Sequence, residues 1–130
     1  MRFLSIYKSP ERNTPPTPDE MCNMGKYIEE SMKRGILIET QGCLPSALGA
    51  RVRVDSGKFT VSDGPFTEAK EVVGGFAILE APSKEAALSF AKEFLAFVGQ
   101  GECELRQLYE ATCVDSNAAA ETAEVVSNRA

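Results

Sequence analysis

The hydrophobic and polar positions of the first 110 residues form short alternating runs separated by two longer stretches with helical spacing. Alternation with a period of two predicts strands, and apolar residues three and four positions apart predict helices. The second helix is predicted over residues 84–98, and the first follows a loop rich in proline. Strands are predicted at residues 3–7, 36–41, 51–54, 58–61, 73–81 and 102–109.

The first helix has a clear start signal at residues 17–20, Thr-Pro-Asp-Glu. Thr17 is the expected N-cap, proline is favoured at the first helical position, and Glu20 completes a capping box. Gly35 is the expected residue after the C-cap. The predicted core-facing stripe of this helix consists of Met21, Met24, Ile28 and Met32.

The order of elements predicts an α+β fold. The segment Asp-Ser-Gly at 55–57 is a hairpin turn signal between two of the short strands. Without that hairpin the order is βαββαβ, the ferredoxin-like unit, in which helices cover one face of an antiparallel sheet. Residues 1–110 are therefore predicted to form one domain, and residues 111–130 a tail that is weakly ordered or docked on a partner subunit.

The two faces of the first strand differ in character. Leu4 and Ile6 point one way, and Phe3, Ser5 and Tyr7 point the other. The aliphatic face is predicted to pack against the helices. The face with the aromatic residues would expose an apolar patch that favours association. A second protomer is therefore predicted to cover it, with a ligand pocket between the two sheets.

Composition and charge narrow the function classes. The chain has 130 residues and a formal net charge of −5, and without a basic patch direct nucleic-acid binding is disfavoured. No apolar run approaches the roughly 20 residues that cross a bilayer. The N-terminal segment lacks the features of a secretion signal, which favours the cytoplasm. Four cysteines outside any C-x-x-C pair are therefore predicted to be free thiols that behave as buried small hydrophobic residues.

The chain contains no histidine. This excludes nucleophilic schemes that need a Ser–His or Cys–His pair, and it excludes imidazole metal sites. The spacing of Asp63, Glu68 and Glu71 fits no known loop for a hard cation. We therefore expect no metal site and no cofactor, and any acid–base chemistry must use a carboxylate, lysine, tyrosine or cysteine with a shifted pKa.

Residues 61–80 carry the densest set of signals. The segment 63–66, Asp-Gly-Pro-Phe, predicts a turn in which Gly64 supplies a positive φ. A charged cluster follows, Glu68, Lys70 and Glu71. From the residues alone, this cluster is either a salt-bridged surface or a site where Lys70 holds one carboxylate charged and desolvation raises the pKa of another.

The same segment resembles the signature of the YCII-related, or DGPF-domain, family. The motif reads Asp-Gly-Pro-Phe, then Glu68, Lys70 and Glu71 at fixed spacing, then Gly-Gly at 74–75 and Phe76. A weaker family pattern precedes it at residues 42–53, and Glu104 and Arg106 match an E-x-R pattern in the last strand. The resemblance implies a dimeric α+β barrel and a homodimer.

The resemblance leaves open whether the chain is an enzyme. By similarity to isomerases and dehalogenases of this fold, Asp63 or Glu68 would be the general acid–base, tuned by Lys70, with Arg51 or Arg106 holding the carboxylate of a small organic acid or lactone. The absence of histidine departs from family members with a His-Asp pair. Ligand contacts are predicted at Tyr7, Gln41, Phe66, Glu104 and Arg106.

Two alternatives stand beside the enzyme. By resemblance, the chain would be a non-catalytic small-molecule-binding or regulatory module associated with sigma-factor transcription control, contacting a sigma factor or another regulator. From the residues, the motif would be a folding device, because Gly64, Pro65, Gly74 and Gly75 suit tight backbone geometry without any chemistry.

Overall fold

The computed structural model describes residues 1–110, so the predicted C-terminal tail lies outside the described residues. The strands and the two α-helices follow one another in the predicted order. The elements are β1 (Arg2–Ser9), α1 (Pro18–Lys33), β2 (Leu37–Gly42), a short 3₁₀ helix η1 (Ser46–Leu48), β3 (Ala50–Asp55), β4 (Lys58–Asp63), β5 (Val72–Glu80), α2 (Lys84–Val98) and β6 (Glu102–Gln107). Neither helix is long and apolar enough to cross a membrane within these residues.

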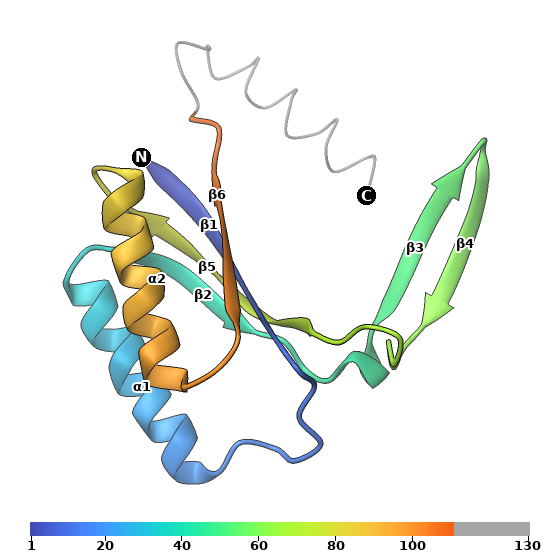
Figure 1. Cartoon of the computed structure of the whole chain (residues 1–130), viewed down its shortest axis with the longest axis horizontal. Coiled ribbons are helices and arrows are strands. Elements are labelled where there is room, and N and C mark those ends of the chain that lie inside the picture. Colours follow the sequence, from blue (N-terminus) through green and yellow to red (C-terminus); the bar gives the residue numbers. More distant parts are fainter. Residues whose placement is uncertain (111–130) are drawn as a thin grey trace.

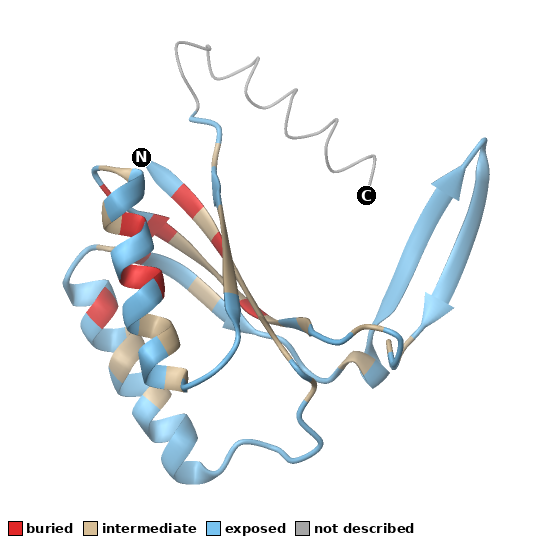
Figure 2. Cartoon of the chain, viewed as in Figure 1, coloured by how far each residue is buried: buried red, intermediate tan, exposed pale blue. Residues whose placement is uncertain are grey.

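Four strands form one antiparallel sheet in the order β2-β5-β1-β6. Both helices lie on one side of this sheet (Figure 1), so the fold is α+β and consistent with the ferredoxin-like unit. Strands β3 and β4 form a separate two-stranded sheet that stands away from the rest of the molecule. Figure 2 shows that the buried residues lie in the four-stranded sheet and on the helices.

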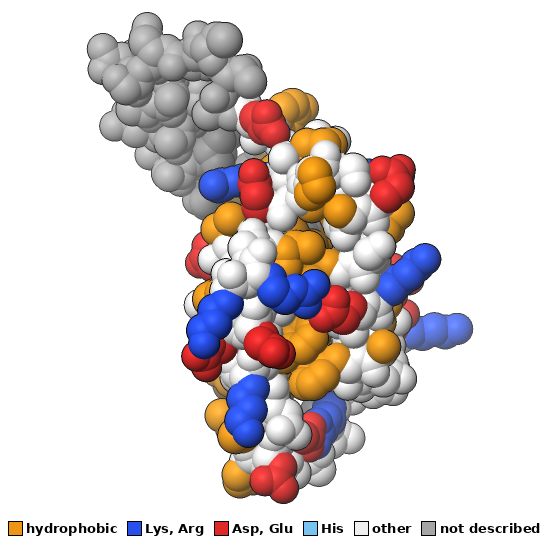
Figure 3. All heavy atoms as spheres, turned by 90° about the vertical axis from the view of Figure 1, so that its left-hand side faces the viewer, with side chains coloured by type: hydrophobic (Ala, Val, Ile, Leu, Met, Phe, Trp, Pro, Cys, Tyr) orange, Lys and Arg blue, Asp and Glu red, His pale blue; other side chains and the backbone are white. Residues whose placement is uncertain are grey.

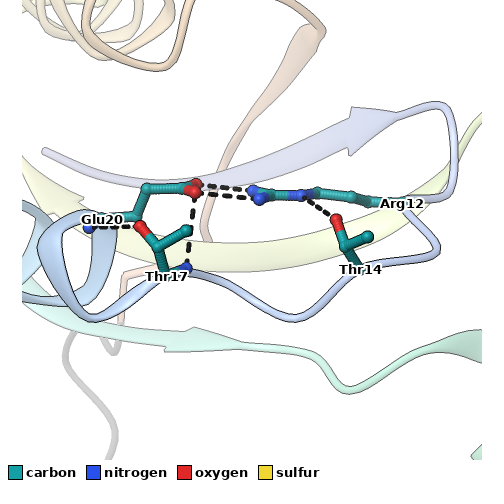
Figure 4. Close-up of polar contacts among 4 residues, drawn as sticks. All are labelled: Arg12, Thr14, Thr17 and Glu20. Atoms are coloured by element: carbon teal, nitrogen blue, oxygen red, sulfur yellow. Dashed lines mark hydrogen bonds and ion pairs between the residues drawn. The ribbon is translucent and has the colours of Figure 1, made fainter.

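The start of α1 is built as the sequence predicts. The backbone N–H of Glu20 donates to Thr17 Oγ1 at 3.1 Å, and Glu20 Oε1 accepts from the backbone N–H of Thr17 at 3.4 Å. The guanidinium of Arg12 then donates two hydrogen bonds to the same carboxylate, at 2.6 and 2.8 Å (Figure 4). The loop before the helix is thereby tied to its first turn.

This arrangement predicts a defined sensitivity to acid. The hydrogen bonds from Arg12 and Thr17 lower the pKa of Glu20 to about 2. A carboxylate with a depressed folded-state pKa stabilises the fold above its ordinary value of 4.5, and this contribution is lost as pH falls toward 2. Melting temperatures measured from pH 6 to pH 2 should therefore fall less steeply below pH 4.5 in Glu20→Gln than in the wild type. Parallel curves for the two proteins would contradict this role.

The predicted stripe on α1 is partly wrong. Met24 and Ile28 face inward, but Met21 and Met32 are exposed. Tyr27 lies on the inward side of α1, and its ring stacks on Phe97 of α2 with ring centroids 4.7 Å apart. A large aromatic ring buries more apolar area than a methionine at the edge of the stripe, so the helix rotates to cover it.

A seam of apolar side chains lies between the two helices on the side that faces solvent. Charged residues border it (Figure 3). Arg34, just after α1, donates hydrogen bonds of 2.8 and 3.3 Å to the carboxylate of Glu93 on α2. Its guanidinium also lies 5.8 Å from the ring centre of Phe90, so this ion pair spans the helix pair above the core.

The predicted assignment of the sheet faces is reversed. Phe3 is 2% exposed and pairs with the fully buried Leu79, and both belong to the core beneath the helices. Leu4 and Ile6 lie on the opposite face, which we call the open face. The physical reason is space: α2 presents the small side chain of Ala87 to this core, which leaves room for the Phe3 ring.

The cysteines also differ from their prediction in part. Cys22 and Cys43 are free but exposed, and Cys103 is half-buried. Burial raises the pKa of the Cys103 thiol, which keeps it in the unreactive protonated form at neutral pH. The prediction of buried small hydrophobic residues is therefore wrong for two of the three described thiols, and Cys113 lies outside the described residues.

Candidate functional site

A cavity of about 360 Å³ lies between the two helices and the sheet. We call it the helix–sheet cavity. From the helices it is lined by Met24, Tyr27, Ile28, Phe90, Ala91, Phe94 and Val98. From the sheet it is lined by Ser5, Tyr7, Leu37, Thr40, Gln41, Gly42, Gly74, Gly75, Phe76 and Ala77. This volume is in the range of natural pockets for small molecules.

The glycines of the central motif create this space. Gly75 pairs across the sheet with Gly42 on one side and Tyr7 on the other, so the floor of the cavity lacks side chains at two neighbouring positions. A Cβ atom on Gly75 would lie 2.7 Å from the carbonyl oxygen of Gln41. The predicted close approach of backbone is confirmed at Gly75, whereas the atoms nearest to Gly74 belong to the Tyr7 ring.

Tyr7 forms one end wall of the cavity. Its hydroxyl donates to the carbonyl oxygen of Gln100 at 2.8 Å, and its ring meets Phe94 edge-on with centroids 5.4 Å apart. The ring lies between two glycines, since a Cβ atom would approach it to 3.0 Å from Gly74 and 2.5 Å from Gly101. Glycine is therefore required on both sides to seat this ring.

The cavity is uncharged among the residues that the structure describes. Its lining contains no Asp, Glu, Lys or Arg side chain, and Tyr7 and Tyr27 are its titratable groups. Burial, reinforced by Glu93, raises the pKa of Tyr27 to about 12, so this phenol is neutral at physiological pH. The hydroxyl of Thr40 is engaged, because it donates to the carbonyl oxygen of Phe76 at 2.8 Å.

The charged residues of the motif lie elsewhere, near the base of the β3–β4 sheet. The guanidinium of Arg51 sits 3.8 Å from the ring centre of Phe66 and forms an ion pair with Glu68. Hydrogen bonds from the backbone N–H of Glu68 and from the Arg51 guanidinium lower the pKa of the Glu68 carboxyl group. Glu68 is thus held as a charged surface carboxylate, and Arg51 is already paired.

Asp63 and Lys70 are exposed at the two ends of this segment. Within residues 1–110, neither side chain makes a hydrogen bond or an ion pair, and neither lines the helix–sheet cavity. The structure does not bring Asp63 beside Arg106, which lies on β6 and donates to Glu104. The three residues predicted to carry catalysis therefore do not converge on the cavity.

Gly64 is required for a reason that the sequence did not reveal. Its φ is not positive, but a Cβ atom there would overlap the carbonyl oxygen of Ser46 in η1. The N–H of Gly64 donates to the carbonyl oxygen of Gly49 at 2.9 Å. Phe66, two residues further along the motif, is held at the same place, because its N–H donates to Ser46 Oγ at 3.2 Å.

Ser46 is in turn held by the loop after β1. Its backbone N–H and its hydroxyl each donate to the Glu11 carboxylate at 2.6 Å. The motif thus joins η1, the base of β3–β4 and the loop before α1. This geometry fits a folding role for its first half.

Glu104 and Arg106 lie on the open face of the sheet. Glu104 accepts hydrogen bonds of 2.9 Å from both Arg106 Nε and Lys8 Nζ. These two cations lower its pKa to about 2. The predicted ligand-contact residues therefore occupy three places: Tyr7 and Gln41 at the cavity, Phe66 at the hairpin base, and Glu104 with Arg106 on the open face.

The comparisons with known proteins agree with the motif. The model of the YCII-related domain matches residues 1–112. The chain belongs to the YCII-related domain family. A protein of Rhizobium meliloti (strain 1021), described as uncharacterised, is 34% identical over 84 residues, which cover 64% of this chain and 64% of that protein. The chain thus matches slightly less than two thirds of that relative's length.

Several lining residues of this YCII-related domain were missed by sequence reasoning. Tyr27, Phe90 and Phe94 are not among the site residues that the sequence predicts, but they line the cavity. The available signal was glycine at two strand positions, Gly42 and Gly75, where a strand would otherwise present side chains to the helices. No group of three or more metal-ligating side chains lies together within residues 1–110.

Proposed function

We propose that this YCII-related protein binds a small, uncharged, largely apolar molecule in the helix–sheet cavity without catalysing a reaction on it. The observation that carries the proposal is a preformed cavity of about 360 Å³ lined by aromatic and aliphatic side chains. Apolar pockets with a few polar groups are typical of small-molecule sites. Ser5, on the helix side of the sheet, supplies a hydroxyl group for orientation. Gln41 and Phe76 pair with each other on the strand positions that face the open side.

The charges support binding over acid–base catalysis. A carboxylate ligand would lose its hydration in the cavity without meeting a cation, which is costly. Arg51 and Arg106, the residues expected to hold such a carboxylate, are paired with Glu68 and Glu104. The cavity is also compatible with the regulatory alternative, in which the bound molecule alters contact with a sigma factor or another regulator.

A pair of alanine-to-leucine variants tests the proposal. Ala91 is buried and lines the cavity, whereas Ala96 is exposed on the same helix. The probe is N-phenyl-1-naphthylamine, an uncharged aromatic molecule whose fluorescence rises in apolar surroundings. We expect Ala91→Leu to weaken its binding at least about tenfold, because the added volume fills the cavity. Ala96→Leu should bind as the wild type does.

A matched probe tests the predicted charge preference. The sulfonated analogue, 8-anilinonaphthalene-1-sulfonate, has the same aromatic skeleton and one negative charge. We expect it to bind at least about tenfold more weakly than the neutral probe. Equal affinity for the two probes, or unchanged binding of the neutral probe by Ala91→Leu, would overturn the proposal.

We further propose that two copies of the chain pair through their open sheet faces as a dimeric α+β barrel. The centre of this face is apolar and only half-buried in one copy, with Leu4, Ile6, Phe76 and Ile78 side by side on two paired strands. Covering such a face with an identical one removes apolar surface from water twice.

Sedimentation velocity tests the dimer. The wild type should sediment as a dimer at micromolar concentrations, and Ile6→Lys should sediment as a monomer with unchanged circular dichroism, because a lysine pair would be buried at the interface. The control is Leu88→Lys, at an exposed leucine of α2, which should remain dimeric. A monomeric wild type would exclude this interface.

A further inference from the structure

Strands β3 and β4 form a projecting arm, residues Ala50–Asp63, with one face that is apolar except for Asp63 at its base. In the antiparallel register Val52 lies opposite Val61, and Val54 lies opposite Phe59. Because paired residues share a face of the sheet, these four side chains lie together. Their exposed fractions are 69%, 65%, 56% and 74% in that order.

The other face of the arm is polar. Arg51 lies opposite Ser62, and Arg53 lies opposite Thr60. Every residue of both strands is exposed, as Figure 2 shows. A two-stranded hairpin without a covered face is at best marginally stable in water. The division into a polar face and a face that is apolar beyond Asp63 therefore indicates that the apolar part is covered by another surface.

The position of the arm limits what that surface is. The arm rises on the side of the four-stranded sheet that is opposite the helices (Figure 1). The open sheet face and the arm therefore border the same space. A partner that packs on the open face of one copy is within reach of that copy's arm.

The size of the apolar face favours a reciprocal contact. At roughly 150 Å² for a large apolar side chain, the four exposed residues present on the order of 400 Å² per arm. One arm on an unrelated protein would bury about 800 Å² in total, which is the size of weak or incidental contacts. Two arms exchanged in a symmetric pair would bury about 1,600 Å², the usual size of a stable interface.

We propose that the apolar face of the arm packs on a second copy of this chain, so that two arms clasp the dimer reciprocally. The inference rests on the proposed dimer and adds a second contact to its sheet-to-sheet interface.

A tryptophan reporter tests the arm directly, because the chain contains no tryptophan. Phe59→Trp places the reporter on the apolar face, and Thr60→Trp places the control one residue away on the polar face. Both are measured in the full chain over a dilution series, alongside sedimentation. We expect blue-shifted emission from Phe59→Trp that moves to the solvent-exposed value with the same midpoint as dissociation of the dimer. Thr60→Trp should stay solvent-exposed throughout.

A second variant pair measures the contribution of the arm to affinity. Val54→Thr with Phe59→Thr places strand-favouring β-branched residues at both positions but removes the apolar surface, and it should weaken dimerisation at least about tenfold. Arg53→Thr on the polar face should change it less than threefold.

The outcomes separate the arm from the other proposals. A dimer in which Phe59→Trp stays solvent-exposed overturns the clasp and leaves the sheet-to-sheet dimer standing. A monomer at all concentrations overturns both, while probe binding in the helix–sheet cavity is judged separately. Blue-shifted emission that persists in the monomer shows an arm folded onto its own chain, and it also overturns the clasp.

Discussion

Replacing Gly64 by alanine should lower the free energy of unfolding by at least about 3 kcal/mol, because the new methyl group would overlap the Ser46 carbonyl. The overlap is with backbone, which cannot rotate away. The two hydrogen bonds that fix this region, from the N–H of Gly64 to Gly49 and from the N–H of Phe66 to Ser46, would have to shift together. Urea unfolding at one fixed protein concentration measures the loss.

The control is the same substitution at Gly25. This glycine is exposed within α1, and a Cβ atom there meets nothing within 4 Å. Alanine has the higher helix propensity, so Gly25→Ala should raise the free energy of unfolding by roughly 0.5–1 kcal/mol. Two variants with equal effects would show that Gly64 is not held against Ser46.

The second large effect is expected at the core beneath the helices. Leu79 is fully buried beside Phe3, so Leu79→Ala should cost about 3 kcal/mol through lost burial and the cavity left behind. The matched change Leu88→Ala, at an exposed leucine of α2, should cost less than about 1 kcal/mol. The two variants are compared by thermal and urea unfolding.

This pair also tests the corrected assignment of the sheet faces. If Leu79 and Phe3 faced away from the helices, truncation of Leu79 would act mainly through the dimer, and its cost would vary with protein concentration. A core position gives a cost that is independent of concentration. A small or concentration-dependent loss in Leu79→Ala would therefore contradict the structure.

Local signals in the sequence predicted the elements of the fold well. The capping box of Thr17 and Glu20, the turn at 55–57 and the period-two strands are properties of neighbouring residues, and the structure shows all of them. The α+β order follows from these elements. Local chemistry decides such features, because capping and turn preferences need no tertiary partner.

Neighbouring residues do not determine which face of a strand or helix packs against the core. The alternation of β1 separates Leu4 from Phe3 but does not state which of them meets a helix. That choice depends on the size of the facing side chains, here Ala87 and Phe90. The same holds for α1, where contact with Phe97 favours Tyr27 over Met21 and Met32 at the inner face.

The candidate site was least accessible to sequence reasoning. The charged residues of the motif suggest acid–base chemistry, but Glu68 forms an ion pair with Arg51 at the surface. The cavity arises instead from absent side chains, at Gly42 and Gly75, combined with rings from both helices. Such a space depends on tertiary packing and has no local pattern in the chain.

The most direct test of the central claim is to locate the bound probe by nuclear magnetic resonance. With N-phenyl-1-naphthylamine in the full chain, we expect intermolecular nuclear Overhauser effects to the methyl groups of Met24, Ala77 and Ala91, which line the helix–sheet cavity. Contacts to Val52, Val54 and Val61 on the arm, without contacts to these three methyl groups, would contradict the account.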